Sequence, residues 1–146
     1  MTENPQPTDQ PQDPAAPQLT EEEMAYVLSL FEMARTGDTE NLLPAVRAGV
    51  PVNLTNGKGD TLLVLAAYHV HTETVRALLE RGADHARVND KGQTAIGAAV
   101  FRQATDIVTA LLDAGADPEL GRQSGVAVAQ VFDLPEMTAL LRAPRS

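Results

Sequence analysis

A pair of histidines is the feature of this sequence that most directly suggests chemistry. His69 and His71 are separated only by Val70, a spacing that raises the possibility of a metal site. Two imidazoles with no third ligand nearby make a poor zinc site, and the chain contains no cysteine. The sequence therefore predicts no bound metal and no cofactor.

Candidate acid–base and nucleophilic residues are equally sparse. Asp84 and Asp117 occur at an interval of 117 − 84 = 33, and each follows a glycine predicted to end a helix. Their recurrence indicates loop residues that bond to the local backbone rather than a unique acid–base pair. Ser29 and Ser124 have no histidine close in sequence, and no nucleophile elbow, phosphate-binding glycine loop or His-Glu-x-x-His motif is present. We predict that the protein is not an enzyme.

The interval between Asp84 and Asp117 recurs along the chain and predicts how the side chains named above are positioned. It separates Gly59 from Gly92 (92 − 59 = 33). A period of this size is the signature of stacked repeats, in which each unit covers the apolar face of the next. The interval also separates Thr61 from Thr94, Ala66 from Ala99 and Gly82 from Gly115.

Composition and charge narrow the function classes. Hydrophobic residues make up 43 % of the chain but aromatics only 3 %, so the core must consist of Ala, Leu and Val in closely packed small helices. The net charge of −9 argues against nucleic acid, whose binding depends on cationic contacts, and against anionic membranes. No early run is both basic and apolar, and no apolar run approaches the length of a membrane span. We therefore expect a cytoplasmic location.

The segment 1–19 differs from the rest of the chain. It is rich in Pro, Gln and Asp and contains no Lys or Arg, so it cannot bury enough apolar surface to order itself. We predict a disordered acidic tail that acts as a tether. Pro11 and Pro14 also match the Pro-x-x-Pro spacing of peptides that dock in aromatic grooves, although no basic residue flanks them.

Order is predicted to begin at Thr20, where Thr20 and Glu23 have the spacing of a capping box. This first helix ends near Gly37, and a second runs from about Thr39 to Ala48. Pro44 inside the second helix requires either a late start or a kink, because an interior proline costs roughly 3 kcal/mol. The apolar stripe of the first helix consists of Val27, Leu28, Leu30, Phe31 and Ala34.

The next two units follow one plan. Asn56 and Gly57 predict a tight reversal, and Thr61 caps a helix that runs to about Tyr68. An outer helix spans about 72–81, and the segment 89–121 repeats the pattern.

The last unit is shorter. Gly125 keeps the interval, but Leu140 follows Leu111 at a distance along the chain of only 140 − 111 = 29. We therefore predict that about four residues (33 − 29) are missing from the loop between its helices, near 132–135. Pro135 suits the first turn of the final helix, and this clipped unit resembles a terminal cap.

These motifs resemble the ankyrin repeat, in particular the short, free-standing bacterial ankyrin proteins. The resemblance rests on Gly59-x-Thr61-Leu62-Leu63-x-Leu65-Ala66-Ala67 and on Val75-x-Ala77-Leu78-Leu79-Glu80-x-Gly82-Ala83-Asp84, which recur from Gly92 to Asp117. It implies an all-α solenoid of helix–turn–helix units joined by β-turn loops. Residues 20–146 would form a single ankyrin repeat domain, with units at about 24–55, 56–88, 89–121 and 122–142.

The sequence departs from the family pattern at the start of each inner helix. The family's Thr-Pro-Leu-His is replaced by Thr61-Leu62-Leu63-Val64 and by Thr94-Ala95-Ile96-Gly97. The imidazole that usually bonds the turn is absent from both units, so the threonines must cap these helices alone. The resemblance also places His71 where the family commonly has a histidine, in the loop between helices.

In an ankyrin stack the turn tips and first helices form a continuous concave surface. Tyr68 and Phe101 are separated by the repeat interval (101 − 68 = 33) and are expected to stack side by side. Two interpretations remain open: they anchor a partner, since interface energy concentrates in aromatic and Arg residues, or they seal the junction between adjacent inner helices. The candidate partner-binding residues are Lys58, Asp60, Tyr68, His69, Asp90, Lys91, Gln93, Phe101, Arg102 and Gln123.

The function that follows is a protein–protein interaction module, an adaptor or inhibitor, that is monomeric alone and binds a protein partner on its concave face. The acidity of the chain favours a basic patch on that partner. The alternative is a structural or assembly subunit that acts through self-association.

Overall fold

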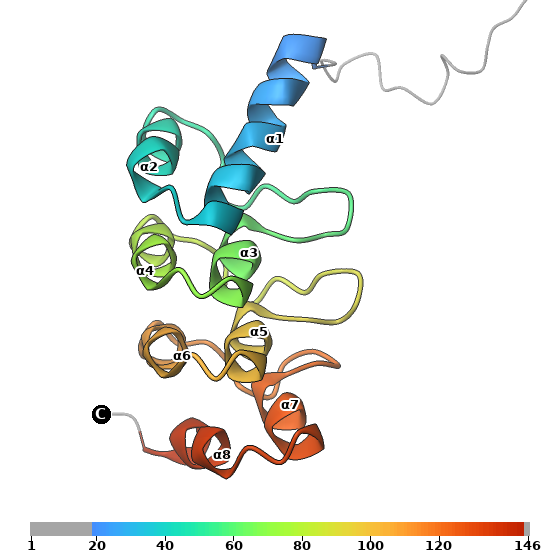
Figure 1. Cartoon of the computed structure of the whole chain (residues 1–146), viewed down its shortest axis with the longest axis vertical. Helices are drawn as coiled ribbons and strands as arrows, with labels where there is room; N and C mark the ends of the chain where they lie inside the picture. Colours follow the sequence, from blue (N-terminus) through green and yellow to red (C-terminus); the bar gives the residue numbers. More distant parts are fainter. Residues whose placement is uncertain (1–18, 145–146) are drawn as a thin grey trace, which may run out of the picture.

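The computed structural model describes residues 19–144, which form eight helices arranged in four consecutive pairs (Figure 1). The predicted tail falls almost entirely outside the described residues. The helices are α1 (Glu21–Thr36), α2 (Thr39–Arg47), α3 (Leu62–Tyr68), α4 (Thr72–Glu80), α5 (Ala95–Phe101), α6 (Thr105–Asp113), α7 (Gly125–Val131) and α8 (Pro135–Arg142).

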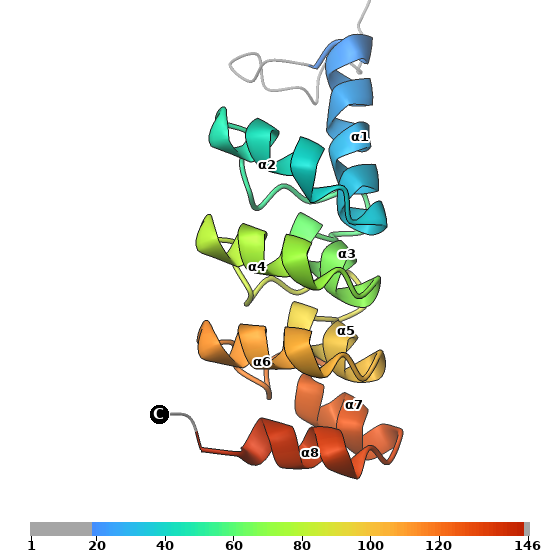
Figure 2. The ribbon, with the colours of Figure 1, turned by 60° about the vertical axis from the view of Figure 1, so that its left-hand side comes forward.

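The pairs stack in two columns. The inner column contains α1, α3, α5 and α7, each in contact with the next, and the outer column contains α2, α4, α6 and α8 (Figure 2). The loops that join one pair to the next project beside the inner column (Figure 1). No β-strand occurs within residues 19–144, where only two isolated bridges form, Thr55 to Thr61 and Gln93 to Gln123. The predicted all-α solenoid is confirmed. No helix in this part of the chain combines the length and the apolar character needed to cross a bilayer.

Side-chain caps start the inner helices as predicted. Thr20 and Glu23 form a complete capping box at the start of α1. Thr61 Oγ1 accepts a hydrogen bond from the Val64 N–H at 3.0 Å, and Thr94 Oγ1 accepts one from the Gly97 N–H at 3.1 Å. Each hydroxyl satisfies one of the N–H groups that a helix start leaves unpaired.

The core is continuous along both columns and consists mainly of Leu, Ile, Val and Ala. In the outer column, Leu78 and Leu111 occupy equivalent buried positions, again at the repeat interval (111 − 78 = 33). Full burial of such a side chain contributes about 1.5–3 kcal/mol. The predicted stripe of α1 is only partly correct, because Leu30, Phe31 and Ala34 are buried whereas Leu28 is exposed.

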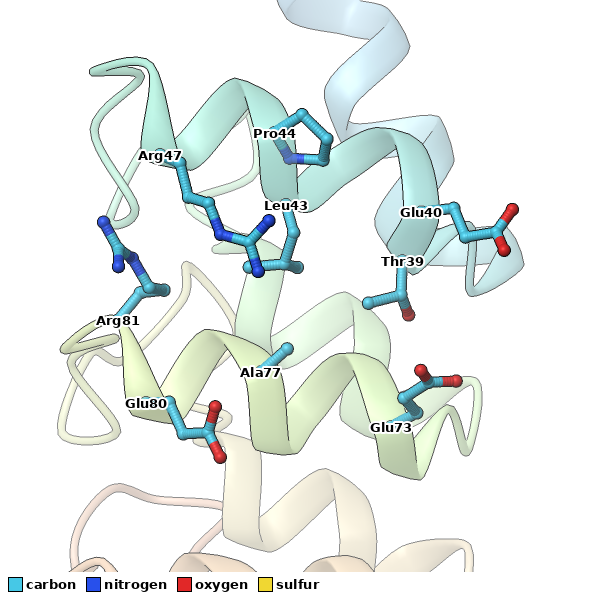
Figure 3. A pocket seen from close by; sticks show the side chains of 9 residues that line it. All are labelled: Thr39, Glu40, Leu43, Pro44, Arg47, Glu73, Ala77, Glu80 and Arg81. Atoms are coloured by element: carbon cyan, nitrogen blue, oxygen red, sulfur yellow. The ribbon is translucent and has the colours of Figure 1, made fainter.

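Helix α2 does not start late to accommodate Pro44. It begins at Thr39 and keeps the proline inside the helix. Pro44 is exposed, so its ring points away from the core (Figure 3). Of the two alternatives, the late start is therefore wrong.

The prediction for the last unit was also wrong in its register. Loop 132–134 is as long as the equivalent loops 69–71 and 102–104. The shortening lies instead in loop 114–124, which is shorter than loop 81–94 by three (94 − 81 against 124 − 114). The turn glycine with positive φ is Gly121, whereas Gly125 is the first residue of α7. The glycine interval at Gly125 and the alignment of Leu140 with Leu111 are thus coincidental: Leu141, not Leu140, takes the buried position that corresponds to Leu111.

Candidate functional site

The loops beside the inner column are shaped by asparagine side chains. Asn56 Oδ1 accepts from the N–H groups of Lys58 and Asp60 at 2.9 and 3.0 Å. One unit later, Asn89 Oδ1 accepts from Lys91 and Gln93 at 3.0 and 2.9 Å. These bonds hold the tip of each loop, residues 56–60 and 89–93, in a fixed shape, and we call each of these projecting loops a finger.

The tight reversal predicted at Asn56 and Gly57 does form, closed by a hydrogen bond from the Gly59 N–H to the Asn56 carbonyl at 3.0 Å, but its backbone conformation differs from the expected one. The residue with positive φ is Gly59, at 79°, and Gly92 adopts the same conformation at 81°. Asn56 acts through its side chain, and Gly57 needs no special backbone conformation. The signal for this arrangement was the repeat interval between the two asparagines (89 − 56 = 33).

Neighbouring fingers are bonded to one another. Asn89, of which only 8 % is exposed, donates from Nδ2 to Asp60 Oδ1 at 2.7 Å. The Asp90 N–H donates to the carbonyl of Lys58 at 3.1 Å. Further along, Gln123 donates from Nε2 to the carbonyl of Lys91 at 2.9 Å. The predicted residues Asp60 and Gln123 therefore have a structural role as well as a place on the finger surface.

An aromatic row crosses the ends of the inner helices. The rings of Tyr68 and Phe101 stack with centroids 6.2 Å apart and planes 7° apart, which confirms that they lie side by side. Phe132 meets Phe101 edge-to-face, with centroids 5.3 Å apart. Phe101 remains 42 % exposed and Phe132 54 % exposed. The row therefore touches across unit boundaries and still presents ring surface to a partner.

Phe132 was missed because the predicted register was wrong. The caps Thr94 and Ser124 are separated by only 124 − 94 = 30, so the position equivalent to Phe101 is 131, next to Phe132. The assumed interval of 33 points instead to Leu134.

Polar groups frame one end of this row. The guanidinium of Arg102 lies over the Tyr68 ring at 5.4 Å from its centroid, and Nη1 donates to the Tyr68 carbonyl at 2.7 Å. His69 meets Tyr68 edge-to-face at 5.1 Å. Burial lowers the pKa of His69, and repulsion from Arg35, His71 and Arg102 lowers it further, whereas Glu32 opposes this shift. His69 is therefore a neutral ring at the edge of the aromatic row at physiological pH.

His71 has a different, structural environment. Its Nε2 lies 2.8 Å from the carbonyl oxygen of Arg35, so the ring ties α4 back to the preceding unit. The His69 and His71 rings stack with centroids 6.5 Å apart. Within residues 19–144, no three His, Cys, Asp or Glu side chains are grouped so that they could hold a metal ion.

Two adjoining hollows gather most of the predicted residues. The larger, of about 710 Å³, lies between the fingers and the inner helices, and the smaller, of about 190 Å³, continues along the aromatic row. Tyr68 and Gln93 line both. We call the combined hollow the finger groove. It is lined by nine of the ten predicted residues, all except Arg102: Lys58, Asp60, Tyr68, His69, Asp90, Lys91, Gln93, Phe101 and Gln123.

The finger groove does not share the acidity of the chain. Lys58 and Lys91 are the only lysines in the sequence, and both lie on its fingers, together with Asp60 and Asp90. The net charge of −9 therefore resides elsewhere, and it does not by itself select a basic partner for this groove.

A third hollow lies on the outer column, between α2 and α4 (Figure 3). Glu40 and Glu73 stand at the N-terminal ends of these helices, whereas Arg47 and Arg81 stand at their C-terminal ends (Figure 3). The helix dipole favours each of these four charges at its position, whereas Glu80, which also lines the hollow, lies at the C-terminal end of α4 where the dipole disfavours it.

Asp84 and Asp117 behave as predicted. Asp84 Oδ1 accepts from the Ala86 N–H at 3.0 Å, and Asp117 Oδ1 accepts from the Glu119 N–H at 2.9 Å. Ser124 caps α7 by accepting from the Ala127 N–H at 3.0 Å. These three side chains are thus engaged in local backbone bonds.

Stacked helical pairs with rigid fingers and an open groove beside the inner column define a helical repeat protein. The chain belongs to the ankyrin repeat family, because residues 30–121 match the family model described as ankyrin repeats in three copies. The resemblance seen in the sequence is confirmed. Ankyrin repeats generally mediate protein–protein interaction, and the family is typically non-enzymatic.

Part of the chain is similar in sequence to a bacterial protein. Over 64 residues the chain is 45 % identical to a protein of Pseudomonas aeruginosa that is described as an ankyrin repeat protein. The aligned segment covers 44 % of this chain and 37 % of that protein, so the match spans less than half of either.

Proposed function

We propose that the finger groove captures a segment of another protein, and that the chain acts as an adaptor or inhibitor in the cytoplasm, by binding and without catalysis. The observation that supports this most strongly is the aromatic row. Tyr68, Phe101 and Phe132 present ring surface along the floor of a groove whose polar walls are held rigid by hydrogen bonds between fingers. Exposed aromatic side chains set among preorganised polar groups are typical interface anchors.

Affinity capture from the cell that makes the protein tests this proposal. The double variant Tyr68→Ala with Phe101→Ala should lose most of the partner captured by the wild type while it keeps the helical circular dichroism spectrum. The matched control is Arg76→Ala, an exposed residue of the outer helix α4. If the double variant melts far earlier and still captures the partner normally, the rings seal the stack and do not anchor a partner.

Self-association is the second candidate, since solenoid surfaces can also pair with copies of themselves. Light scattering over a range of protein concentrations separates the two functions. A mass that stays at that of one chain supports capture of another protein, whereas a mass that rises with concentration supports an assembly role.

We also propose that residues 20–146 fold as a single ankyrin repeat domain and that residues 1–19 serve as a tether. Removal of residues 1–18 should leave the urea melting curve unchanged. A large loss of stability on removal would show that this segment is part of the folded domain.

A further inference from the structure

Helix α1 is longer than its position in the stack requires. It has 16 residues, whereas each of the other inner helices, α3, α5 and α7, has 7. Full burial is confined to its second half, which includes Leu30 and Ala34, and Val27 in the first half is only partly buried against the core. The first half extends beyond α2 at the N-terminal end of the stack (Figures 1 and 2).

The extending half is apolar where a terminal unit should be polar. Four large hydrophobic side chains are exposed on or beside it: Leu19, Met24, Tyr26 and Leu28, the last of them 57 % exposed. They line a hollow of about 690 Å³ whose other side consists of loop residues such as Val50 and Leu54. We call the apolar surface that surrounds this hollow the N-terminal face.

The opposite end of the solenoid shows the contrast. Among the described residues, α8 exposes no large hydrophobic side chain, and its outward positions include Glu136 and Arg142. End units of a solenoid need a polar outer face to remain soluble. Val131 at the end of α7 and the neighbouring Phe132 are also exposed, but the outward side of α8 is polar. The outer helix α8 therefore closes its end of the stack with a polar surface, whereas α1 leaves an apolar one, and exposed apolar patches of this kind mark interaction sites.

The charge around the N-terminal face selects its occupant. Residues 1–34 contain no Lys or Arg, and Glu21, Glu22 and Glu23 form the exposed first turn of α1. A second copy of the chain would bring these carboxylates against their own kind. The chain's own residues 1–18 carry the same charge and contain no Val, Leu, Ile, Phe, Tyr or Trp with which to cover the face.

We propose that the N-terminal face binds an amphipathic helix of another protein that carries Lys or Arg beside its apolar stripe. Met24 and Leu28 are four positions apart, so they lie on the same side of α1 and offer a ridge for such a helix to pack against. Its basic residues meet the glutamates of the first turn. This surface meets the finger groove only at Asn56 and Gly57, which line both hollows, and the proposal does not depend on the function proposed for the groove.

Synthetic peptides provide the test with the full-length protein. The probe is a fluorescent helical peptide of about 15 residues with a Leu stripe flanked by Lys. One control replaces every Lys by Glu, and a second keeps the composition but scrambles the order so that no stripe forms. Anisotropy titrations measure affinity, and amide chemical shifts locate the binding site.

The Leu/Lys peptide should bind, shift the amides of α1, and bind more weakly as salt is added. Met24→Ser with Leu28→Ser should weaken it by at least about tenfold, as loss of two buried anchors requires. Phe101→Ala in the finger groove should leave it unchanged, and melting curves of each variant confirm that the stack is intact.

Three results would overturn the proposal. Equal binding of the scrambled peptide would show attraction by charge alone. If the control peptide with Glu in place of every Lys bound equally well, basic residues of the partner would have no role in recognition. Wild-type dimerisation that Met24→Ser with Leu28→Ser abolishes would assign the face to a second copy of the chain.

Discussion

The substitution Gly97→Ala tests whether the shortened last loop brings the final unit into direct contact with α5. Gly97 lies inside α5, where a Cβ would meet the carbonyl oxygen of Gln123 well inside the 3.0 Å that real Cβ atoms keep. The corresponding residue of the preceding unit is Val64, which has room for its side chain. Gly97 is therefore the position that allows the last finger to approach.

Two opposing effects set the size of the change. Helix propensity favours Ala over Gly in a helix interior by about 1 kcal/mol. The overlap involves a backbone atom, which cannot rotate away, so its cost lies near the upper end of the roughly 1–3 kcal/mol typical of overpacking. The net expectation is a loss of about 2 kcal/mol.

Urea melts followed by far-ultraviolet circular dichroism measure this loss, since the chain contains no Trp. Gly57→Ala is the matched control: nothing lies within 4 Å of its added Cβ, and its φ is not positive. It should be neutral or stabilising by up to about 1 kcal/mol. Hydrogen exchange in Gly97→Ala should show that α7 and α8 lose protection first. A Gly97→Ala protein as stable as the wild type would refute the close approach of the last unit.

Three further predictions concern the core, the fingers and the aromatic row. Leu78→Ala should destabilise by about 2–5 kcal/mol in urea melts because it empties a fully buried site, and a loss below about 0.5 kcal/mol would remove Leu78 from the core. Asn89→Ala should cost about 2–3 kcal/mol, more than Asn56→Ala, because Asn89 also bonds to Asp60 in the neighbouring finger; equal losses would contradict that link. The pKa of His69 measured by NMR should lie below about 6.5. Because the unfolded chain then binds the proton more readily than the folded one, His69 lowers the stability of the fold as the pH drops from about 7 to 5. The variant His69→Asn should therefore lose less stability over this pH range than the wild type. A pKa at or above about 6.5 would contradict the stated environment.

Most of the fold followed from local signals that recur. The caps at Thr61 and Thr94 and the closing glycines depend on a few neighbouring residues, so the sequence alone places them correctly. The stacking of Tyr68 on Phe101 followed from the repeat, because equal intervals place equivalent residues on adjacent units.

The errors arose where a repeat changes length or where a side chain acts across units. In the last unit, the predicted register was aligned on Gly125, which fits the repeat interval only by chance, although the residue that caps α7 is Ser124. In that shifted register, the position equivalent to Phe101 is not next to Phe132, so the contact between the two rings was not predicted. Leu28 matches a helical stripe, but the sequence does not show that α1 extends past α2 and leaves this side chain uncovered. The bond from Asn89 to Asp60 joins two loops and has no local signature beyond the recurring asparagine.

Site-specific photo-crosslinking tests the central claim of a partner in the finger groove most directly. A benzoylphenylalanine placed at Lys91, on a finger, should crosslink a partner in the cell that makes the protein, and Tyr68→Ala with Phe101→Ala should abolish the adduct. The same probe at Arg76, on the outer column, should give no adduct with that partner. Crosslinks from position 76 but not from position 91 would contradict the account.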